Sequence, residues 1–163
     1  MTPMNTDFEL LFTFVRTMTD EDQEKLQPRR GSDFSAGWDL VADLSESLLI
    51  QPLERHLVPT GLATAIPVGW EGQIRPRSGL AFRHGLTVLN GPGTIDADYR
   101  GEIKVLLIHL GNEAFTLEPG TRMAQLVLTP THTGGLHFMP SLPPTPEAAR
   151  SRGTGGFGST GRH

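Results

Sequence analysis

The sequence predicts an all-β domain, and two observations carry that prediction. The 163-residue chain holds 19 glycines and 13 prolines, which fall at intervals that suit short strands and turns better than long helices. Several apolar segments alternate with a period of two, the period of a half-buried strand. The length fits one domain that is large enough to bury a core.

The first thirty residues are expected to hold one strand and one insertion. Residues 8–15 alternate with a period of two and predict the first strand. Residues 19–26 are acidic and allow a single helical turn after Thr19, which residues 27–31 then end. Loop-length priors favour a surface insertion for this segment.

Short strands are expected along the rest of the chain, separated by proline and glycine. They cover residues 35–42, 48–50, 56–59, 62–66, 71–75, 102–110 and 121–128. The strand at 102–110 is the most hydrophobic, so we expect it to cross the core. Asp39 lies in an apolar strand, and a buried carboxylate needs a partner or a hydrated cation.

The stretch at residues 91–102 is the one around which the rest is organised. Its Gly91-Pro92-Gly93 run forbids a helix and demands a sharp reversal, so it predicts a β-hairpin or a corner. That turn would present one carboxylate, Asp96, and one aromatic ring, Tyr99. On these residues alone, a functional site and a solvated turn are equally good readings.

A second polar cluster follows the strand at 71–75. Arg77, Ser78 and the backbone N–H of Gly79 precede a short helical stretch, and together they suit an anion. The plainer alternative is an ordinary helix start with Ser78 as its N-cap. Gln125, in the strand at 121–128, is exposed in the plain reading and matters only if it faces the same cavity as Asp96.

The last residues change in composition. Residues 140–146 hold four prolines and read as an extended linker. Residues 152–161 are rich in glycine, which is typical of a flexible tail. Phe157 suits stacking on a planar ring, however, and Arg152 and Ser159 suit phosphate oxygens. We therefore expect residues 1–139 to form the domain and residues 140–163 to form a linker and an arm.

Composition excludes several classes of function. The chain has no cysteine, hence no disulfide framework, which fits a cytoplasmic protein. No apolar run approaches the ~20 residues of a membrane span, so no membrane contact is expected. The net charge of −4 argues against general nucleic-acid binding. The six histidines are scattered without the spacing of a metal site.

Five segments in this order resemble the five motifs of the trimeric deoxyuridine triphosphatase (dUTPase) family, which hydrolyses dUTP to dUMP and pyrophosphate. They are residues 36–40, 76–81, 90–102, 120–126 and 152–161. Trp38 stands in the first motif where Tyr or Phe is commoner. The match runs from about residue 35 to residue 161 and leaves the first thirty residues outside it.

The resemblance implies a jelly-roll-like β-barrel subunit and a homotrimer with three active sites between subunits. One chain would supply the base pocket, a second the phosphate-binding motifs, and the third its C-terminal arm. Magnesium is implied on the triphosphate, with Asp39 contacting it through water or only holding an arginine of the phosphate site. The reaction would supply dUMP for thymidylate synthesis and keep uracil out of DNA.

The resemblance also implies a role for each site residue. Asp96 would be the general base that activates water against the α-phosphorus. Asn90 and the backbone near Thr94 and Ile95 would read the uracil edge, with Lys104 close to the nucleotide. Tyr99 would lie beneath the deoxyribose, excluding a 2′-hydroxyl. Residues at the phosphates and the attacking water would be Arg77, Ser78, Gly79 and Gln125. The ligand would be capped by Arg152, Phe157, Gly158 and Ser159, with the Phe157 ring on uracil.

Two alternatives stay open at this point. A dCTP deaminase shares the implied fold, although the Ser78-Gly79 pair and the glycine-rich arm disfavour it. A regulatory protein that binds dUTP without turnover is the other, with the acidic residues 20–22 as a partner surface. Ammonia release from dCTP, and binding of a partner with and without residues 1–30, would discriminate these readings.

Overall fold

The computed structural model describes residues 9–132 and 134–144, and its all-β character confirms the predicted fold class. The chain divides into two units, Met1–Thr133 and Gly134–His163. The described part of the second unit, residues 134–144, contains neither helix nor strand. Strands of the first unit are β1 (Leu11–Phe14), β2 (Arg29–Arg30), β3 (Gly37–Val41), β4 (Leu48–Ile50), β5 (Arg55–Pro59), β6 (Leu62–Ala65), β7 (Trp70–Pro76), β8 (Leu86–Val88), β9 (Gly93–Ile95), β10 (Lys104–His109), β11 (Phe115–Leu117) and β12 (Arg122–Pro130).

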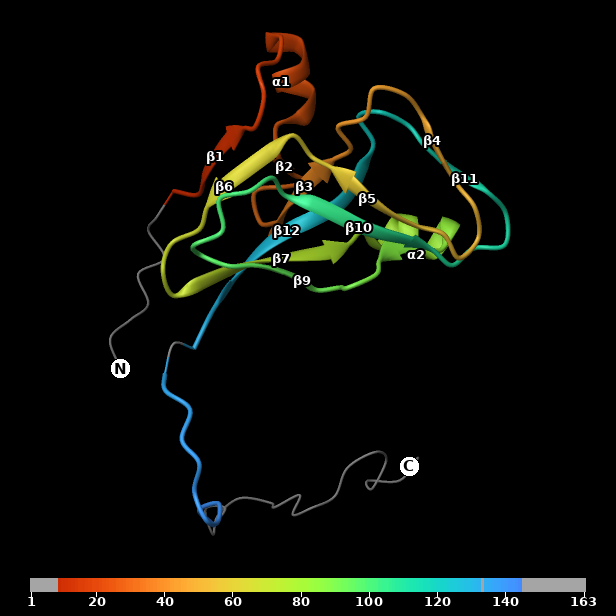
Figure 1. Cartoon of the computed structure of the whole chain (residues 1–163). Helices are drawn as coiled ribbons and strands as arrows, with labels where there is room; N and C mark the ends of the chain where they lie inside the picture. Colours follow the sequence, from red (N-terminus) through yellow and green to blue (C-terminus); the bar gives the residue numbers. More distant parts are fainter. Residues whose placement is uncertain (1–8, 133, 145–163) are drawn as a thin grey trace. The chain divides into compact units, whose positions relative to one another are not determined.

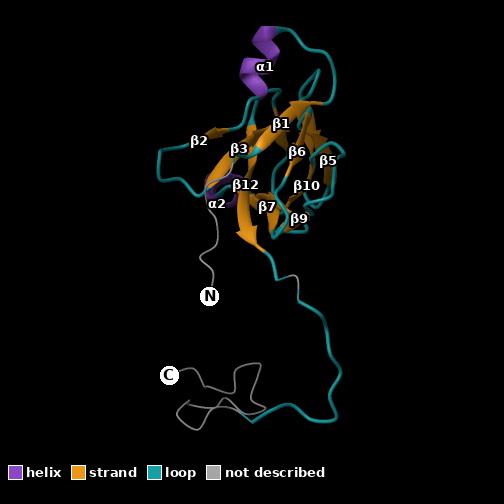
Figure 2. Cartoon of the chain, turned by 90° about the vertical axis from the view of Figure 1, so that its left-hand side faces the viewer, coloured by secondary structure: helices purple, strands orange, loops and turns teal. Residues whose placement is uncertain are grey.

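The largest sheet of the first unit has five strands in the order β2-β3-β12-β7-β9 (Figure 1). A second sheet has the order β5-β10-β8, and β1-β6 and β11-β4 form two further pairs. Figure 2 shows β3, β12 and β7 on one side of this unit and β5 and β10 on the other. Because β12 is central in its sheet, residues of β3 and β7 flank it on both sides.

The core lies between these sheets. Leu40, Ile74 and Leu126 bury their side chains from the five-stranded sheet, and Val105 and Leu107 bury theirs from β10. Buried and partly exposed residues alternate along β10, as expected for the strand predicted to cross the core. Each fully buried aliphatic side chain contributes about 1.5–3 kcal/mol, so these strands fix the frame that carries the polar cluster.

Helix α1 (Asp20–Leu26) occupies the predicted insertion and is longer than the single turn expected. The hydroxyl of Thr19 caps it by accepting from the N–H of Asp22 at 3.2 Å. At its other end Leu26 is buried with Met18 and Val41. The cap and this apolar contact extend the turn into a helix, and β2 then pairs with β3 as an edge strand.

Helix α2 (Ser78–His84) follows β7 and ends at Gly85, whose φ of 67° is left-handed. The main chain packs closely there, since a Cβ on Gly85 would lie 2.6 Å from the nitrogen of Gly111. Leu110 donates its N–H to the Gly85 carbonyl, and Nε2 of the buried His109 contacts the His84 carbonyl oxygen at 2.9 Å. These contacts tie α2 to the end of β10. Within residues 9–132 and 134–144, no helix is long and apolar enough to cross a membrane.

Gly85→Ala is expected to lower the free energy of unfolding by about 3 kcal/mol or more, because left-handed strain adds to a backbone clash. Gly120→Ala is the matched control, since Gly120 has a φ of 78° but no atom within 4 Å of its Cβ position. Gly120→Ala should lower the free energy of unfolding by only about 1 kcal/mol. Denaturant unfolding at one protein concentration measures both, and equal losses would contradict the packing argument.

Candidate polar cleft

A polar cleft of about 380 Å³ lies where β3, β12 and the start of α2 meet. The sheet register explains the meeting, because Gln125 of β12 pairs with Asp39 of β3 on one side and Arg75 of β7 on the other. Segments of β3, β12 and the junction of β7 with α2, which are far apart in sequence, therefore meet at this cleft. The cleft is lined by Gly31, Ser35, Ala36, Gly37, Asp39, Arg77, Ser78, Gly79, Leu80, Arg83, Arg122 and Gln125.

The carboxylate of Asp39 is shared by two arginines. Its Oδ1 lies 3.1 Å from Nε of Arg77, and its Oδ2 accepts from Nη1 of Arg122, also at 3.1 Å. Arg77 in turn donates from Nη1 to the backbone carbonyl of Arg122 at 2.8 Å. The Asp39 side chain is only 15% exposed and that of Arg77 30%, so water screens this pair less than the pair with Arg122, whose side chain is 58% exposed. This geometry favours the reading in which Asp39 holds an arginine.

The same geometry does not fit a metal held by protein ligands. Both oxygens of Asp39 are already paired with arginines, because Oδ1 forms an ion pair with Arg77 and Oδ2 accepts a hydrogen bond from Arg122. Among the residues that the structure describes, no three His, Cys, Asp or Glu side chains are grouped for an ion. The cleft instead carries three arginines and one aspartate, a formal charge of +2 in a chain of net charge −4. Such a cleft attracts a polyanion.

Ser78 and Gln125 both line this cleft, which decides the open reading of Ser78. That Gln125 faces the same cavity as Asp96 stays a prediction. Ser78 is the first helical residue of α2, and the N-cap is Arg77 without a side-chain bond, so the reading of Ser78 as N-cap is wrong. The exposed Ser78 hydroxyl remains available to a ligand. Gln125 is half-buried, and its amide nitrogen donates to the Pro76 carbonyl at 3.0 Å.

The central stretch forms a corner and not a hairpin. Strand β8 pairs with β10, whereas β9 pairs with β7, so the two strands on either side of Gly91 belong to different sheets. The side chain of Asn90 lies over Gly93, because a Cβ there would be 3.1 Å from its Nδ2. Both Asn90 and Thr94 are exposed on this corner, and Ile95 is half-buried.

A tight turn follows β9 and brings Asp96 and Tyr99 together. The N–H of Tyr99 donates to the Asp96 carbonyl at 3.1 Å, and the Tyr99 hydroxyl donates to the Glu102 carbonyl at 2.9 Å. A Cβ on Gly101 would lie 2.7 Å from Cζ of this ring, so a glycine is needed there. The carboxylate of Asp96 is exposed, and Lys104 pairs with Glu102 at 3.4 Å.

Asp96 and the arginine cleft lie at opposite ends of β7. Ile95, the residue before Asp96, pairs with Gly72, whereas Arg77 directly follows the last residue of β7. Arg77 is five positions after Gly72, and at ~3.3 Å per strand residue this is roughly 17 Å. One chain therefore keeps Asp96 apart from the cleft. Asn90 lies toward the cleft end of β7, because a Cβ on the neighbouring Gly91 would be 3.6 Å from Cδ of Pro76.

Two cleft residues escaped the sequence reading, and four predicted residues cannot be placed. Arg122 was not singled out from the sequence, although the need of Asp39 for partners was a signal for it. Arg83 lies one helical turn after Gly79, a spacing that would have indicated it. The predicted cap residues Arg152, Phe157, Gly158 and Ser159 lie outside the described residues.

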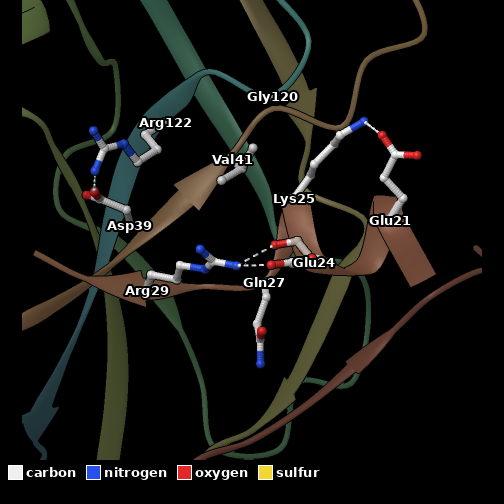
Figure 3. Close-up of a pocket in the computed structure, with 9 residues that line it drawn as sticks. All are labelled: Glu21, Glu24, Lys25, Gln27, Arg29, Asp39, Val41, Gly120 and Arg122. Atoms are coloured by element: carbon white, nitrogen blue, oxygen red, sulfur yellow. Dashed lines mark hydrogen bonds and ion pairs between the residues drawn. The ribbon is translucent and has the colours of Figure 1, made fainter. Parts of the chain in front are cut away.

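A second hollow of about 430 Å³ lies beside α1 and shares Asp39 and Arg122 with the cleft (Figure 3). Each charged side chain that lines it is paired. Lys25 contacts Glu21 at 2.7 Å and Arg29 contacts Glu24 at 3.5 Å, in addition to the Arg122–Asp39 pair. The hydrogen bond that Lys25 donates to the Glu21 carboxylate raises the pKa of Lys25. This hollow therefore offers no free charged group to a ligand.

Comparison with known proteins relates the chain to dUTPases. The dUTPase family model matches residues 23–161. A deoxyuridine 5′-triphosphate nucleotidohydrolase from Cytophaga hutchinsonii is 56% identical over 129 residues, which is 78% of this chain and 80% of the relative. One of the same name from Fusobacterium nucleatum is 49% identical over 148 residues, covering 91% of this chain and 97% of the relative.

Solved structures show the same fold at lower identity. The dUTPase of Staphylococcus bacteriophage 80alpha with dUPNHPP superposes with a TM-score of 0.77 at 24% identity, covering 94% of this chain and 98% of the phage chain. A mutant dUTPase from phage phi11 of S. aureus, which reveals the coordination of a structural Mg(II) ion, gives 0.71 at 21% identity. It covers 83% of this chain and 99% of its own.

Asp39→Asn tests whether this carboxylate orders the arginines or only neutralises them. We expect inorganic pyrophosphate to bind about threefold to tenfold more weakly, because Arg77 and Arg122 lose their shared anchor. Asp43→Asn is the control, since it removes an equal charge from the Arg16–Asp43 pair outside the cleft. Titration calorimetry measures both, and tighter binding to Asp39→Asn would show that charge alone matters.

Proposed function

The chain belongs to the dUTPase family, and on that premise we propose that it hydrolyses dUTP to dUMP and pyrophosphate. The observation that carries the proposal is the arginine cleft, whose charge of +2 suits a triphosphate. The reaction would supply dUMP for thymidylate synthesis and keep uracil out of DNA. The corner and its turn, with their exposed polar side chains, would take the nucleoside end of the substrate.

The phosphate chain is assigned to the cleft. Arg77 offers the guanidinium donors that Asp39 and the Arg122 carbonyl leave unused, and a planar fork of this kind matches phosphate oxygens. The exposed hydroxyl of Ser78 and the N–H of Gly79 add neutral donors. Gln125, already fixed by its bond to the Pro76 carbonyl, would hold the attacking water with its side-chain oxygen.

The nucleoside is assigned to the corner. Asn90 and the backbone at Thr94 and Ile95 would read the uracil edge, with Lys104 close to the nucleotide. Tyr99 would lie beneath the deoxyribose, where its ring is fixed by the bond to the Glu102 carbonyl and by Gly101. A rigid ring at this place leaves no room for a 2′-hydroxyl, and a tight corner leaves none for a 5-methyl group.

Asp96 is the proposed general base. Its exposed carboxylate accepts a proton from water as the water oxygen attacks the α-phosphorus. The bond between the α-phosphorus and the bridging oxygen to the β-phosphate breaks, and that oxygen leaves with pyrophosphate. The attacking oxygen stays on dUMP, so atoms and charge balance without a redox partner.

We propose that the working molecule is a homotrimer in which different chains supply the corner and the cleft. A base and a phosphate anchor must both reach the same phosphoryl group, and roughly 17 Å along β7 separates them within one chain. Exposed apolar side chains such as Leu11, Leu57 and Leu110 give the subunit surface that association needs. The cap residues Arg152, Phe157, Gly158 and Ser159 would come from the third chain.

Magnesium is proposed on the triphosphate oxygens of the substrate and not on a protein site. The pairing of both Asp39 oxygens with arginines leaves that carboxylate unsuited to direct coordination. A contact between Asp39 and the ion through water stays a prediction. Bound to the substrate, the cation would neutralise part of the charge of the triphosphate.

The substrate is tested by pyrophosphate release from dUTP, dCTP, dTTP and UTP, with magnesium and with EDTA. We expect selective release from dUTP, lowered by EDTA, and no ammonia release from dCTP. Ammonia release from dCTP would instead assign the protein as a deaminase. Tight dUTP binding without release from any nucleotide would favour a regulatory protein.

Asp96→Asn should slow dUTP turnover at least ~100-fold while dUTP binding is retained, because an amide cannot accept the proton from water. Asp98→Asn is the matched control, an exposed carboxylate two residues away for which we propose no role. Steady-state kinetics and nucleotide binding separate the two effects. Near-normal turnover of Asp96→Asn would remove Asp96 from the role of base.

A further inference from the structure

Arg83 is a cleft residue to which no role has been given so far. It lies on the last turn of α2, yet its guanidinium points back along the helix to Gly79. A Cβ on Gly79 would lie 3.0 Å from Nη2 of Arg83 and 3.4 Å from its Nη1. Both terminal nitrogens therefore lie against the residue next to Ser78, inside the cleft.

Arg83 differs from the other two arginines of the cleft because it has no partner among the residues that the structure describes. Arg77 and Arg122 share the Asp39 carboxylate. Within the described part of the chain, Arg83 makes neither an ion pair nor a hydrogen bond, so its five N–H donors are free. Like charges of Arg77 and Arg122 line the same space, and an anion between them would relieve the repulsion.

The identity of residue 79 fits this position of Arg83. A side chain on residue 79 would occupy the space that the guanidinium fills, and the flexible guanidinium would move away. Glycine thus leaves Arg83 seated against the helix. An arginine that is merely exposed on the surface would not need this space against the helix, because its side chain can extend into water.

We propose that Arg83 is a further substrate-binding residue that contacts the phosphate chain beyond the α-phosphate. The inference rests on the proposed function and adds a residue to it. Arg83 binds the part of the triphosphate that leaves as pyrophosphate, so it acts on the affinity for dUTP and pyrophosphate and not on that for dUMP. Glycine at position 79 is a positioning residue for this contact.

The test compares Arg83→Gln with Arg55→Gln, because Arg55 is an exposed arginine of β5 outside the cleft. Loss of a charge-assisted hydrogen bond should raise KM for dUTP about tenfold in Arg83→Gln, with kcat changed less than about twofold. Inorganic pyrophosphate should bind about tenfold more weakly by calorimetry, and dUMP should bind as before. Arg83→Lys, which keeps the charge without the fork, should recover part of the loss.

A second pair of variants tests whether Gly79 positions Arg83. In a Gly79→Ala background, Arg83→Gln should cause much less than its tenfold effect, because the guanidinium is already displaced. If Arg83→Gln has its full tenfold effect in the Gly79→Ala background as well, Gly79 does not position Arg83. Equal losses in Arg83→Gln and Arg55→Gln would reduce the effect to net charge and overturn the proposal.

The outcomes also separate this inference from the proposed function. Unchanged pyrophosphate affinity in Arg83→Gln, in a protein that hydrolyses dUTP, would overturn the role of Arg83 alone. If the wild-type chain hydrolyses no deoxynucleotide but Arg83→Gln still weakens pyrophosphate binding, the anion site stands and the assigned reaction fails.

Discussion

The arrangement of the cleft depends on one carboxylate shared by two arginines. Asp39 comes from β3, Arg77 follows β7, and Arg122 begins β12, so this pairing connects three strands that the sheet register places side by side. A half-buried carboxylate cannot stay unpaired at low cost, and a cleft with several arginines cannot stay ordered without a counter-charge. The carboxylate gains partners, and the arginines gain a counter-charge. The charge left over is positive and is available to a ligand.

The second constraint is the length of β7. The strand separates Asp96 from the arginine cleft by roughly 17 Å along its length. On the proposed function, a single subunit would be a scaffold with two half-sites at its two ends. This geometry supports the proposal that the catalytic unit is an assembly, in which the corner of one chain meets the cleft of another. Function then follows from how the subunits associate, and each half-site is built by ordinary strand register.

Much of the fold was predictable from local pattern. The period-two segments at β1 and β10, and the acidic turn after Thr19, were correctly assigned because burial and capping follow the nearest residues. Strands β8 and β11 were not predicted, and both pair only with strands that are distant in sequence. For the central stretch the sequence allowed a hairpin or a corner, and the corner is confirmed because distant partners decide sheet membership. Single motifs indicated Arg77 and Ser78, whereas Arg83 required the three-dimensional contact with Gly79.

The central claim, that one site takes its base and its phosphate anchor from different chains, is tested most directly by mixing two inactive variants. Arg77→Gln and Asp96→Asn subunits, unfolded and refolded together, should recover about a quarter of the wild-type rate, because random association pairs an intact corner with an intact cleft at about one contact in four. A tag on one variant confirms that mixed assemblies form. Mixed assemblies with no activity above that of the separate variants would contradict the account and place both groups in one chain.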